Sequence, residues 1–186
     1  MIRGAALKTA EHLQEGESLV ASPVITNFMK QQGFPDEPAD ACNMRFEGLY
    51  FQPRIVFPLV LVGILFQSAW LFLALSAILW WNAFLPGLNP FEAVYNRFVA
   101  PRRGTGPLTP APMPRRFAQG MAAAFLLGTG AALSAGWPVV SWVLQGLLVV
   151  AFAALLFGKF CLGAYVYHLL KGRVSFANST LPWARP

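Results

Sequence analysis

Lys159 and Cys161 lie inside an almost unbroken apolar stretch that runs from residue 138 to residue 170. A nearby cation lowers the pKa of a thiol and makes it more reactive, so the pair is a candidate for thiol chemistry. Two residues apart on a helix, however, side chains do not share a face. Cys161 therefore has three interpretations: a small buried side chain, a reactive thiol, or half of a disulfide with Cys42.

The remaining chemistry-bearing residues form no catalytic constellation. The two histidines, His12 and His168, lie far apart in the sequence, and Glu92 is the last acid in the chain. An activated nucleophile or a carboxylate pair would need partners that the sequence does not bring together. The two cysteines lack metal-ligand spacing. We therefore expect a non-enzymatic protein without cofactor or metal, with His168 at a membrane interface.

The composition indicates a membrane protein. Apolar residues make up 56% of the 186 residues and charged residues only 12%, whereas soluble proteins average about 25% charged residues. The net charge of +6 does not indicate nucleic-acid binding, because the basic residues flank apolar segments and do not line a face with interleaved aromatics. Topology and anionic lipid headgroups explain these basic residues more simply.

Four transmembrane helices fit the apolar segments. Residues 55–85 would form a helix of about 46 Å, against a hydrocarbon core of about 30 Å, so we expect a hairpin that turns at Gln67 and Ser68. The first helix then begins near residue 46 and places Glu47 and Arg54 among the headgroups. The predicted fold is an all-α integral membrane protein of two helical hairpins. Its spans cover residues 46–66, 69–85, 117–134 and 139–158, the last continuing to residue 170.

Residues 1–44 read as a cytoplasmic leader with one or two short helices, and residues 171–186 as a cytoplasmic tail. The first helix would cover residues 2–13. The second has Ser22 as N-cap, Pro23 at its first position and Gly33 just past its end. An apolar stripe on this second helix is expected to rest on the bilayer or on a partner. It consists of Val24, Ile25, Phe28 and Met29.

The loop of residues 86–116 contains one more predicted helix, over residues 90–99. Asn89 and Glu92 form a capping box and Pro90 takes the first helical position. The spacing of its apolar residues predicts an amphipathic helix in the membrane interface. That face consists of Phe91, Val94, Tyr95, Phe98 and Val99. A proline- and arginine-rich extended linker is expected to follow.

Small residues recur every four positions in the third apolar helix. They are Gly120, Ala124, Gly128 and Ala132. Repeats of this kind let membrane helices approach closely, so we expect this face to contact a neighbouring helix. A general abundance of alanine is the alternative explanation.

The basic residues predict the orientation. Five arginines lie in the central loop: Arg97, Arg102, Arg103, Arg115 and Arg116. The two predicted short turns carry no charge, so the positive-inside rule places the central loop and both termini in the cytoplasm. These arginines are expected to contact lipid headgroups.

The same topology places Lys159 at the inner interface, about 20 residues from the outer end of the last helix. Glu47, at the inner end of the first helix, then becomes an ion-pair partner for Lys159 or Arg54. We expect Glu47, Arg54, Lys159 and Cys161 to form one polar cluster at the cytoplasmic mouth of the bundle.

Four motifs together resemble a known family. NMRFEGLYFQPRIVF, NPFEAVYNRFV, PRRFAQGMAA and FGKFCLGAYVYHLL are similar to the bacterial family catalogued as domain of unknown function 4395, over about residues 43–170. The most specific parts are residues 116–119 and 160–163. The resemblance implies a four-helix protein of the bacterial inner membrane. Some relatives sit beside thioredoxin-like or sulfurtransferase-like proteins, which implies thiol or sulfur chemistry.

The chain departs from this family at one position. Many relatives read Phe-Cys-Leu-Gly-Cys, a CxxC pair that can cycle between dithiol and disulfide. Here Ala164 occupies the second cysteine position, so Cys161 cannot form that local disulfide.

These observations favour a non-enzymatic accessory or assembly subunit of an inner-membrane complex, bound to lipid and to other membrane subunits. A thiol-redox or sulfur-handling protein that works with a thioredoxin-like or sulfurtransferase partner is the alternative. A small-molecule carrier is weaker, because the internal repeats and broken helices of transporters are not evident in the sequence.

Overall fold

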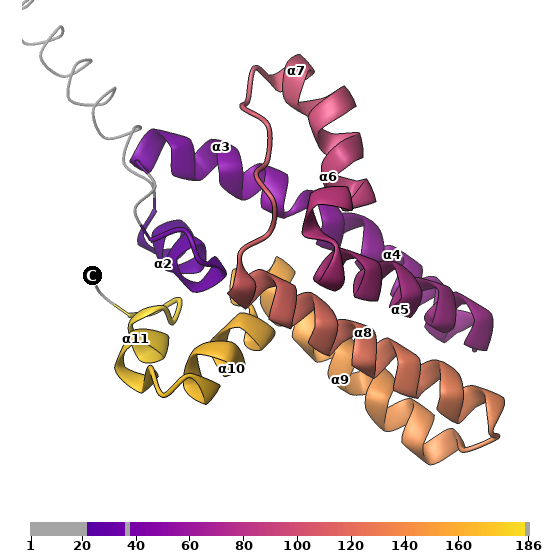
Figure 1. The fold of residues 1–186 in the computed structure, drawn as a ribbon. Coiled ribbons are helices and arrows are strands. Elements are labelled where there is room, and N and C mark those ends of the chain that lie inside the picture. The colour runs from indigo at the N-terminus through magenta and orange to yellow at the C-terminus, as the bar shows by residue number, and fades with distance from the viewer. Residues whose placement is uncertain (1–21, 36–37, 185–186) are drawn as a thin grey trace, which may run out of the picture.

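Two helical hairpins form the body of the protein (Figure 1). The computed structural model describes residues 22–35 and 38–184, so the helix expected at residues 2–13 lies outside the described residues. The first hairpin consists of α4 (Phe51–Leu65) and α5 (Ala69–Phe84), and the second of α8 (Met113–Ser134) and α9 (Pro138–Leu156). α5 packs along α8, and α4 contacts α9, so the four helices form one bundle.

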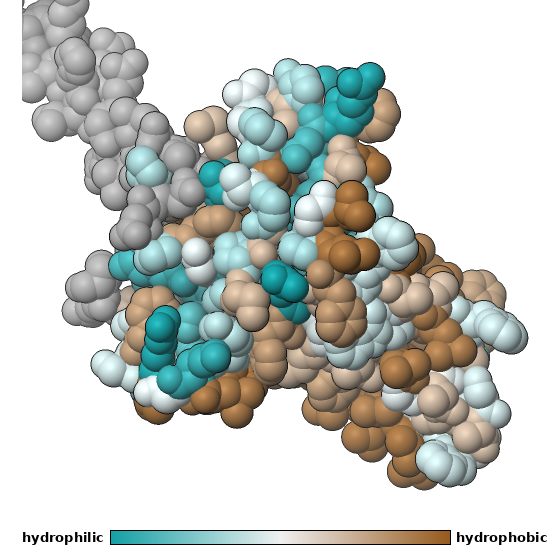
Figure 2. Space-filling model, in the orientation of Figure 1, coloured by the Kyte–Doolittle hydropathy of each residue, from teal (hydrophilic) through white to brown (hydrophobic). Residues whose placement is uncertain are grey.

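Three helical stretches are long and apolar enough to cross a membrane: Cys42–Leu65, Met113–Ser134 and Pro138–Leu156. The helix α5 is also apolar but has only 16 residues. The outer surface of the bundle agrees with a lipid environment, because Figure 2 shows apolar residues over the far end of α8 and α9. Every regular element in the described ranges is a helix, as expected of an all-α membrane protein.

The turn between α4 and α5 lies at Gln67 and Ser68, where the sequence predicts it. Gln67 takes a left-handed backbone conformation with φ 45°. The side-chain amides of Gln67 and Gln145 bond to each other in both directions, with N–O distances of 3.2 Å. Gln145 also donates to Ser141 Oγ at 2.9 Å. This buried polar contact attaches the turn of the first hairpin to α9.

The expected first helix is divided in two. A separate helix, α3 (Ala39–Leu49), precedes α4, and Figure 1 shows the chain changing direction between them. Pro53 explains the break, since it has no N–H to donate to the carbonyl of Leu49. The first span predicted from residue 46 thus lies within one helical stretch, Cys42–Leu65, which is interrupted at Tyr50.

The loop helix begins at Pro90, where Asn89 Oδ1 accepts from the N–H groups of Phe91 and Glu92. It is longer than predicted, because α6 (Pro90–Val94) continues through a π-helical turn (Tyr95–Val99) into α7 (Ala100–Arg103). A short 3₁₀ turn, Pro86–Leu88, precedes it. The extended linker shrinks to residues 104–112, because Pro101 lies in the continuation of the loop helix and Pro114 in the first turn of α8, where a missing N–H costs nothing.

The last predicted helix also breaks. α9 ends at Leu156, and after an irregular segment the chain continues as α10 (Leu162–Leu170) and α11 (Val174–Ser179). Lys159 takes a left-handed conformation with φ 51°, and the Phe160 N–H bonds back to the Ala154 carbonyl at 3.1 Å. This closed turn directs α10 across the start of α8 instead of along the axis of α9.

The first described helix, α2 (Pro23–Gln32), has Ser22 as N-cap and ends at Gly33 with φ 98°, as predicted. It packs against α3, α8 and α10. We call α2, α3, α10 and α11 the end layer, because they cover one end of the bundle. Phe28 and Met29 are buried within this layer, so the predicted contact of their stripe with the bilayer or a partner is wrong.

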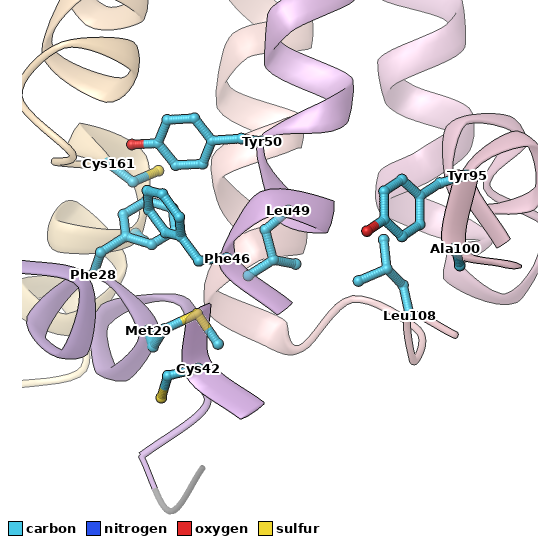
Figure 3. Close-up of a cluster of buried hydrophobic side chains, with 11 residues drawn as sticks. Phe28, Met29, Cys42, Phe46, Leu49, Tyr50, Tyr95, Ala100, Leu108 and Cys161 are labelled. Carbon is cyan, nitrogen blue, oxygen red and sulfur yellow. The ribbon is translucent and has the colours of Figure 1, made fainter. Parts of the chain in front are cut away.

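The core consists of two clusters. The first lies between α4, α5, α8 and α9 and is centred on Val56, Phe72, Leu79, Leu126 and Phe152. The second joins the end layer to the loop helices, and Figure 3 shows its side chains. It consists of Phe28, Met29, Cys42, Phe46, Leu49, Tyr50, Tyr95, Ala100, Leu108, Cys161 and Ala164.

Candidate functional site

Cys161 is the N-cap of α10 and lies in the second core cluster (Figure 3). Its own N–H donates to Gln31 Oε1 at 2.8 Å. Burial raises the pKa of the thiol, and the backbone hydrogen bonds from Ala164 and Gly163, with the Gln32 amide nearby, oppose that effect only in part. At neutral pH the sulfur is therefore held mainly as the less reactive thiol.

Cys42 is also buried, but at a different place in the same cluster. In Figure 3, Phe28 and Met29 lie between the two sulfur atoms. This arrangement separates the two side chains that the sequence left open as a disulfide pair.

His168 does not lie at an exposed interface as expected. It is buried, and its Nε2 lies 3.0 Å from the carbonyl oxygen of Gln31. Asn27, also buried, donates from Nδ2 to the carbonyls of Leu181 and Ala184, each at 3.0 Å. These contacts attach α2 to the C-terminal segment across most of the chain length, so the end layer is one packed unit.

The predicted polar cluster is only partly one site. Glu47 forms an ion pair with Arg54 at 2.7 Å and lies 3.7 Å from Arg103. The Lys159 ammonium lies 5.5 Å from the centre of the Phe46 ring. These charged groups are at the surface, whereas Cys161 is buried in the second core cluster. The charged cluster at the surface therefore also includes Arg103. The Cys161 thiol is not part of it.

Arg115 differs from its expected role at the headgroups, because it is buried with 6% of its surface exposed. Its Nη2 lies 3.8 Å from Oε1 of Glu92, which is buried too. Burial raises the pKa of Glu92, against the opposing effects of Arg115 and Asn89. The neighbouring Arg116 donates from Nε to the Ala83 carbonyl at 2.8 Å and so attaches α8 to α5. Arg97, Arg102 and Arg103 remain exposed.

The loop helix divides its apolar residues between two sides. Tyr95 is almost wholly buried against Phe51, and Val99 packs against the same core. Phe91 packs against the cluster inside the bundle. Val94 and Phe98 are exposed. Of the five residues predicted to form an outward apolar face, only Val94 and Phe98 therefore face outward.

The small-residue face of α8 contacts two different helices. A Cβ atom added to Gly120 would lie 3.4 Å from the Trp80 ring of α5, and one added to Gly128 would lie 3.2 Å from Leu144 of α9. Ala132 is buried, but Ala124 is exposed. Residues four apart drift by about 40° around a helix, so the four do not face one neighbour.

A close helix crossing joins the two most specific motifs of the sequence. A Cβ atom at Gly163 would lie 2.7 Å from Cα and 2.8 Å from Cβ of Ala118. α10 therefore crosses α8 at the segment of residues 116–119, and only glycine fits there. No local signal in the sequence predicts this contact, since the two residues are far apart in the chain.

A pocket of about 200 Å³ opens beside this crossing, between α4, α8, α9 and the end layer. Apolar side chains form most of its wall. Its polar side chains come from the ends of helices: Gln32, Gln52, Arg115 and Gln119. Gln119 Nε2 donates to Gln52 Oε1 at 2.9 Å. The sequence carried one signal of this site, the four-residue spacing of Arg115 and Gln119 at the start of a membrane helix.

Together, the helical hairpins, the apolar exterior and the absence of strands in the described ranges define an all-helical membrane protein. Residues 47–172 match the family described as "Domain of unknown function (DUF4395)". The match covers more than half of the chain, so the protein belongs to this family. No curated protein and no solved structure matches the chain.

Proposed function

We propose that the protein is a non-enzymatic accessory or assembly subunit of a bacterial inner-membrane complex, with four spans and both termini in the cytoplasm. The proposal rests on three large apolar side chains exposed on the end layer, outside the three candidate spans, which we take together as an apolar patch. Leu170, Val174 and Trp183 expose 71%, 51% and 76% of their surfaces there. Exposed apolar groups outside the bilayer typically mark contact with another protein.

The rigidity of the end layer supports this role. Asn27, Gln31 and His168 are buried polar residues that join α2 to the segment bearing the patch. A surface that is ordered before binding loses less conformational entropy when a partner docks. Trp183 provides the large aromatic side chain that interface hot spots favour.

The thiol-redox alternative receives less support from the geometry. Cys161 is buried, its pKa is raised, and Ala164 occupies the position where relatives carry a second cysteine. Each of these features lowers the rate at which Cys161 would react with a soluble partner.

The test replaces Trp183 by Ala and measures the size of the particle in mild detergent by native gel electrophoresis. We expect the wild type in a discrete complex and Trp183→Ala in a smaller particle. The matched control is Trp137→Ala, because Trp137 is similarly exposed at the opposite end of the bundle. A wild type that migrates as a monomer, or equal losses in both variants, would contradict the proposal.

A further inference from the structure

The pocket beside α8 has a polar end and an apolar end. Its polar residues come from the C-terminus of α2, the start of α4 and the start of α8, and Cys161 lies beside them. Phe125, Leu147 and Val150 line the opposite part, nearer the middle of the bundle. The pocket thus changes from polar to apolar along the bundle axis, in the same direction as one leaflet of a bilayer.

Several buried polar atoms at the polar end have no hydrogen-bond partner among the described residues. They are Nη1 of Arg115, Nε2 of Gln32 and Oε1 of Gln119. Each of these side chains is more than nine-tenths buried, at 6%, 4% and 7% exposure. An unsatisfied buried polar group costs about 1–3 kcal/mol, and a charged group costs more. Two of the three atoms are donors, so the end of the pocket favours an acceptor-rich group.

The charge of the site favours an anion. Arg115 has Glu92 as its only ion-pair partner among the described residues, and the two atoms are 3.8 Å apart, too far for a hydrogen bond. Burial favours the protonated form of Glu92. With its partner 3.8 Å away and no hydrogen bond between them, Glu92 compensates the positive charge of Arg115 only in part.

The apolar part of the pocket opens toward the lipid-facing surface. Leu147, Val150 and Leu162 line the pocket while exposing 50%, 64% and 42% of their surfaces. A ligand can therefore enter from the bilayer between helices. The volume of about 200 Å³ is below the ~300–1,000 Å³ of pockets for drug-sized ligands, so it suits one acyl chain and not a whole two-chain lipid.

We propose that this pocket binds an acyl lipid with an acidic head, its carboxylate or phosphate at Arg115 and Gln32 and one acyl chain between α4, α8 and α9. Gln119 would meet a hydroxyl or other donor of the same head. This binding site is independent of the docking patch on the end layer. Basic pockets between membrane helices on the cytoplasmic side are known to hold lipid headgroups.

The experiment compares four probes on the full-length protein in nonionic maltoside, measured by native mass spectrometry. The probes are palmitate, palmitoyl lysophosphatidylglycerol, hexadecanol and inorganic phosphate. We expect saturable binding of one or both acidic lipids, about tenfold weaker binding of hexadecanol, and none of phosphate alone. Equal binding of hexadecanol would overturn the acidic-head assignment. Binding of inorganic phosphate as tight as that of the lipids would overturn the lipid assignment.

Two variants test the location of the site. Ala151→Phe places a ring inside the pocket, and we expect at least about tenfold weaker binding. Ala124→Phe is the control, because Ala124 is exposed on α8 and does not line the pocket. The double variant Arg115→Gln/Glu92→Gln removes both buried ionisable groups together, so it tests the head contact without leaving Glu92 unpaired. Lipid binding unchanged in Ala151→Phe and in the double variant would overturn the proposal.

Discussion

Cys161 occupies the N-cap of α10, with backbone N–H groups near its sulfur, yet only 8% of its surface is exposed. A helix N-terminus alone would favour the thiolate. Burial has the larger effect and raises the pKa. The balance of these two effects on the pKa of Cys161 decides whether the residue has a packing role or a redox role.

We therefore predict slow alkylation of Cys161 by a maleimide at neutral pH in the folded protein. Cys42 is replaced by Ser so that Cys161 is the one cysteine. The control moves the cysteine to an exposed position of the end layer, with Cys161→Ser and Ser179→Cys. Its alkylation should be at least about tenfold faster, and denaturation should abolish the difference. Equal rates in the folded proteins would restore the thiol-chemistry interpretation.

Glu92 gives a pH-dependent prediction. Because burial raises its pKa, the folded protein holds this proton more tightly than the unfolded chain does. Its contribution to stability is fully present below the ordinary carboxyl pKa of 4.5 and is lost as pH rises through the higher folded pKa. Glu92→Gln cannot ionise, so its thermal stability in detergent should fall less over this window.

The control for that measurement is Glu47→Gln, which removes an exposed ion pair and keeps Glu92. Because the hydrogen bond from Arg54 lowers the pKa of Glu47, this carboxyl titrates below the window of Glu92, and the variant should retain the wild-type slope above the ordinary carboxyl pKa. An unchanged slope in Glu92→Gln would show that this carboxyl does not titrate as its burial requires.

At the scale of elements, local signals predicted the helix starts and turns well. Ser22 and Gly33 limit α2, Asn89 and Pro90 start α6, and the hairpin turns at Gln67. In each case the interaction that fixes the helix end or the turn is made between residues close in the chain, so it can be predicted from the local sequence.

The helix breaks and buried polar groups were not predicted, because distant contacts decide them. Lys159 adopts a left-handed conformation that costs about 1–2 kcal/mol for a non-glycine residue, and packing of α10 on α8 holds it there. Arg115 was assigned to headgroups because its partner Glu92 lies in another element. The pocket likewise depends on three helices and the end layer meeting.

The crossing of α10 and α8 gives the sharpest element-scale prediction. Gly163→Ala would place a Cβ atom 2.7 Å from the Ala118 Cα, so overpacking should destabilise the protein by about 1–3 kcal/mol. Gly146→Ala is the matched control in α9, where no atom lies within 4 Å of the added Cβ. It should be neutral or stabilising by up to about 1 kcal/mol. Thermal unfolding in detergent measures both, and a Gly163→Ala protein as stable as the control would refute the close crossing.

At the scale of the whole molecule, the number of spans depends on α5, whose 16 residues are fewer than the 24, 22 and 19 of the three candidate spans. With four spans, the loop at Gly106 and the end layer at Ser179 lie on the same side of the membrane, and Ala135 lies on the other. Ser22, at the start of α2, then lies on the side of Gly106 as well. With three spans, α5 does not cross the membrane, so Ser22 and Gly106 would lie on opposite sides.

Single cysteines at these four exposed positions distinguish the topologies. In a background with Cys42→Ser and Cys161→Ser, a membrane-impermeant maleimide added to intact spheroplasts should label Ala135→Cys. It should label Ser22→Cys, Gly106→Cys and Ser179→Cys only after permeabilisation. Labelling of Ser22→Cys and Gly106→Cys from opposite sides would contradict the four-span topology.

The central claim is that the apolar patch of the end layer contacts another subunit in the membrane of the living cell. The most direct measurement places a photo-crosslinking amino acid at position 183, with position 137 as the matched control, since both tryptophans are exposed. We predict one protein adduct in high yield from position 183 and lipid adducts from position 137. Lipid adducts alone at position 183, or the same pattern at both positions, would contradict the account.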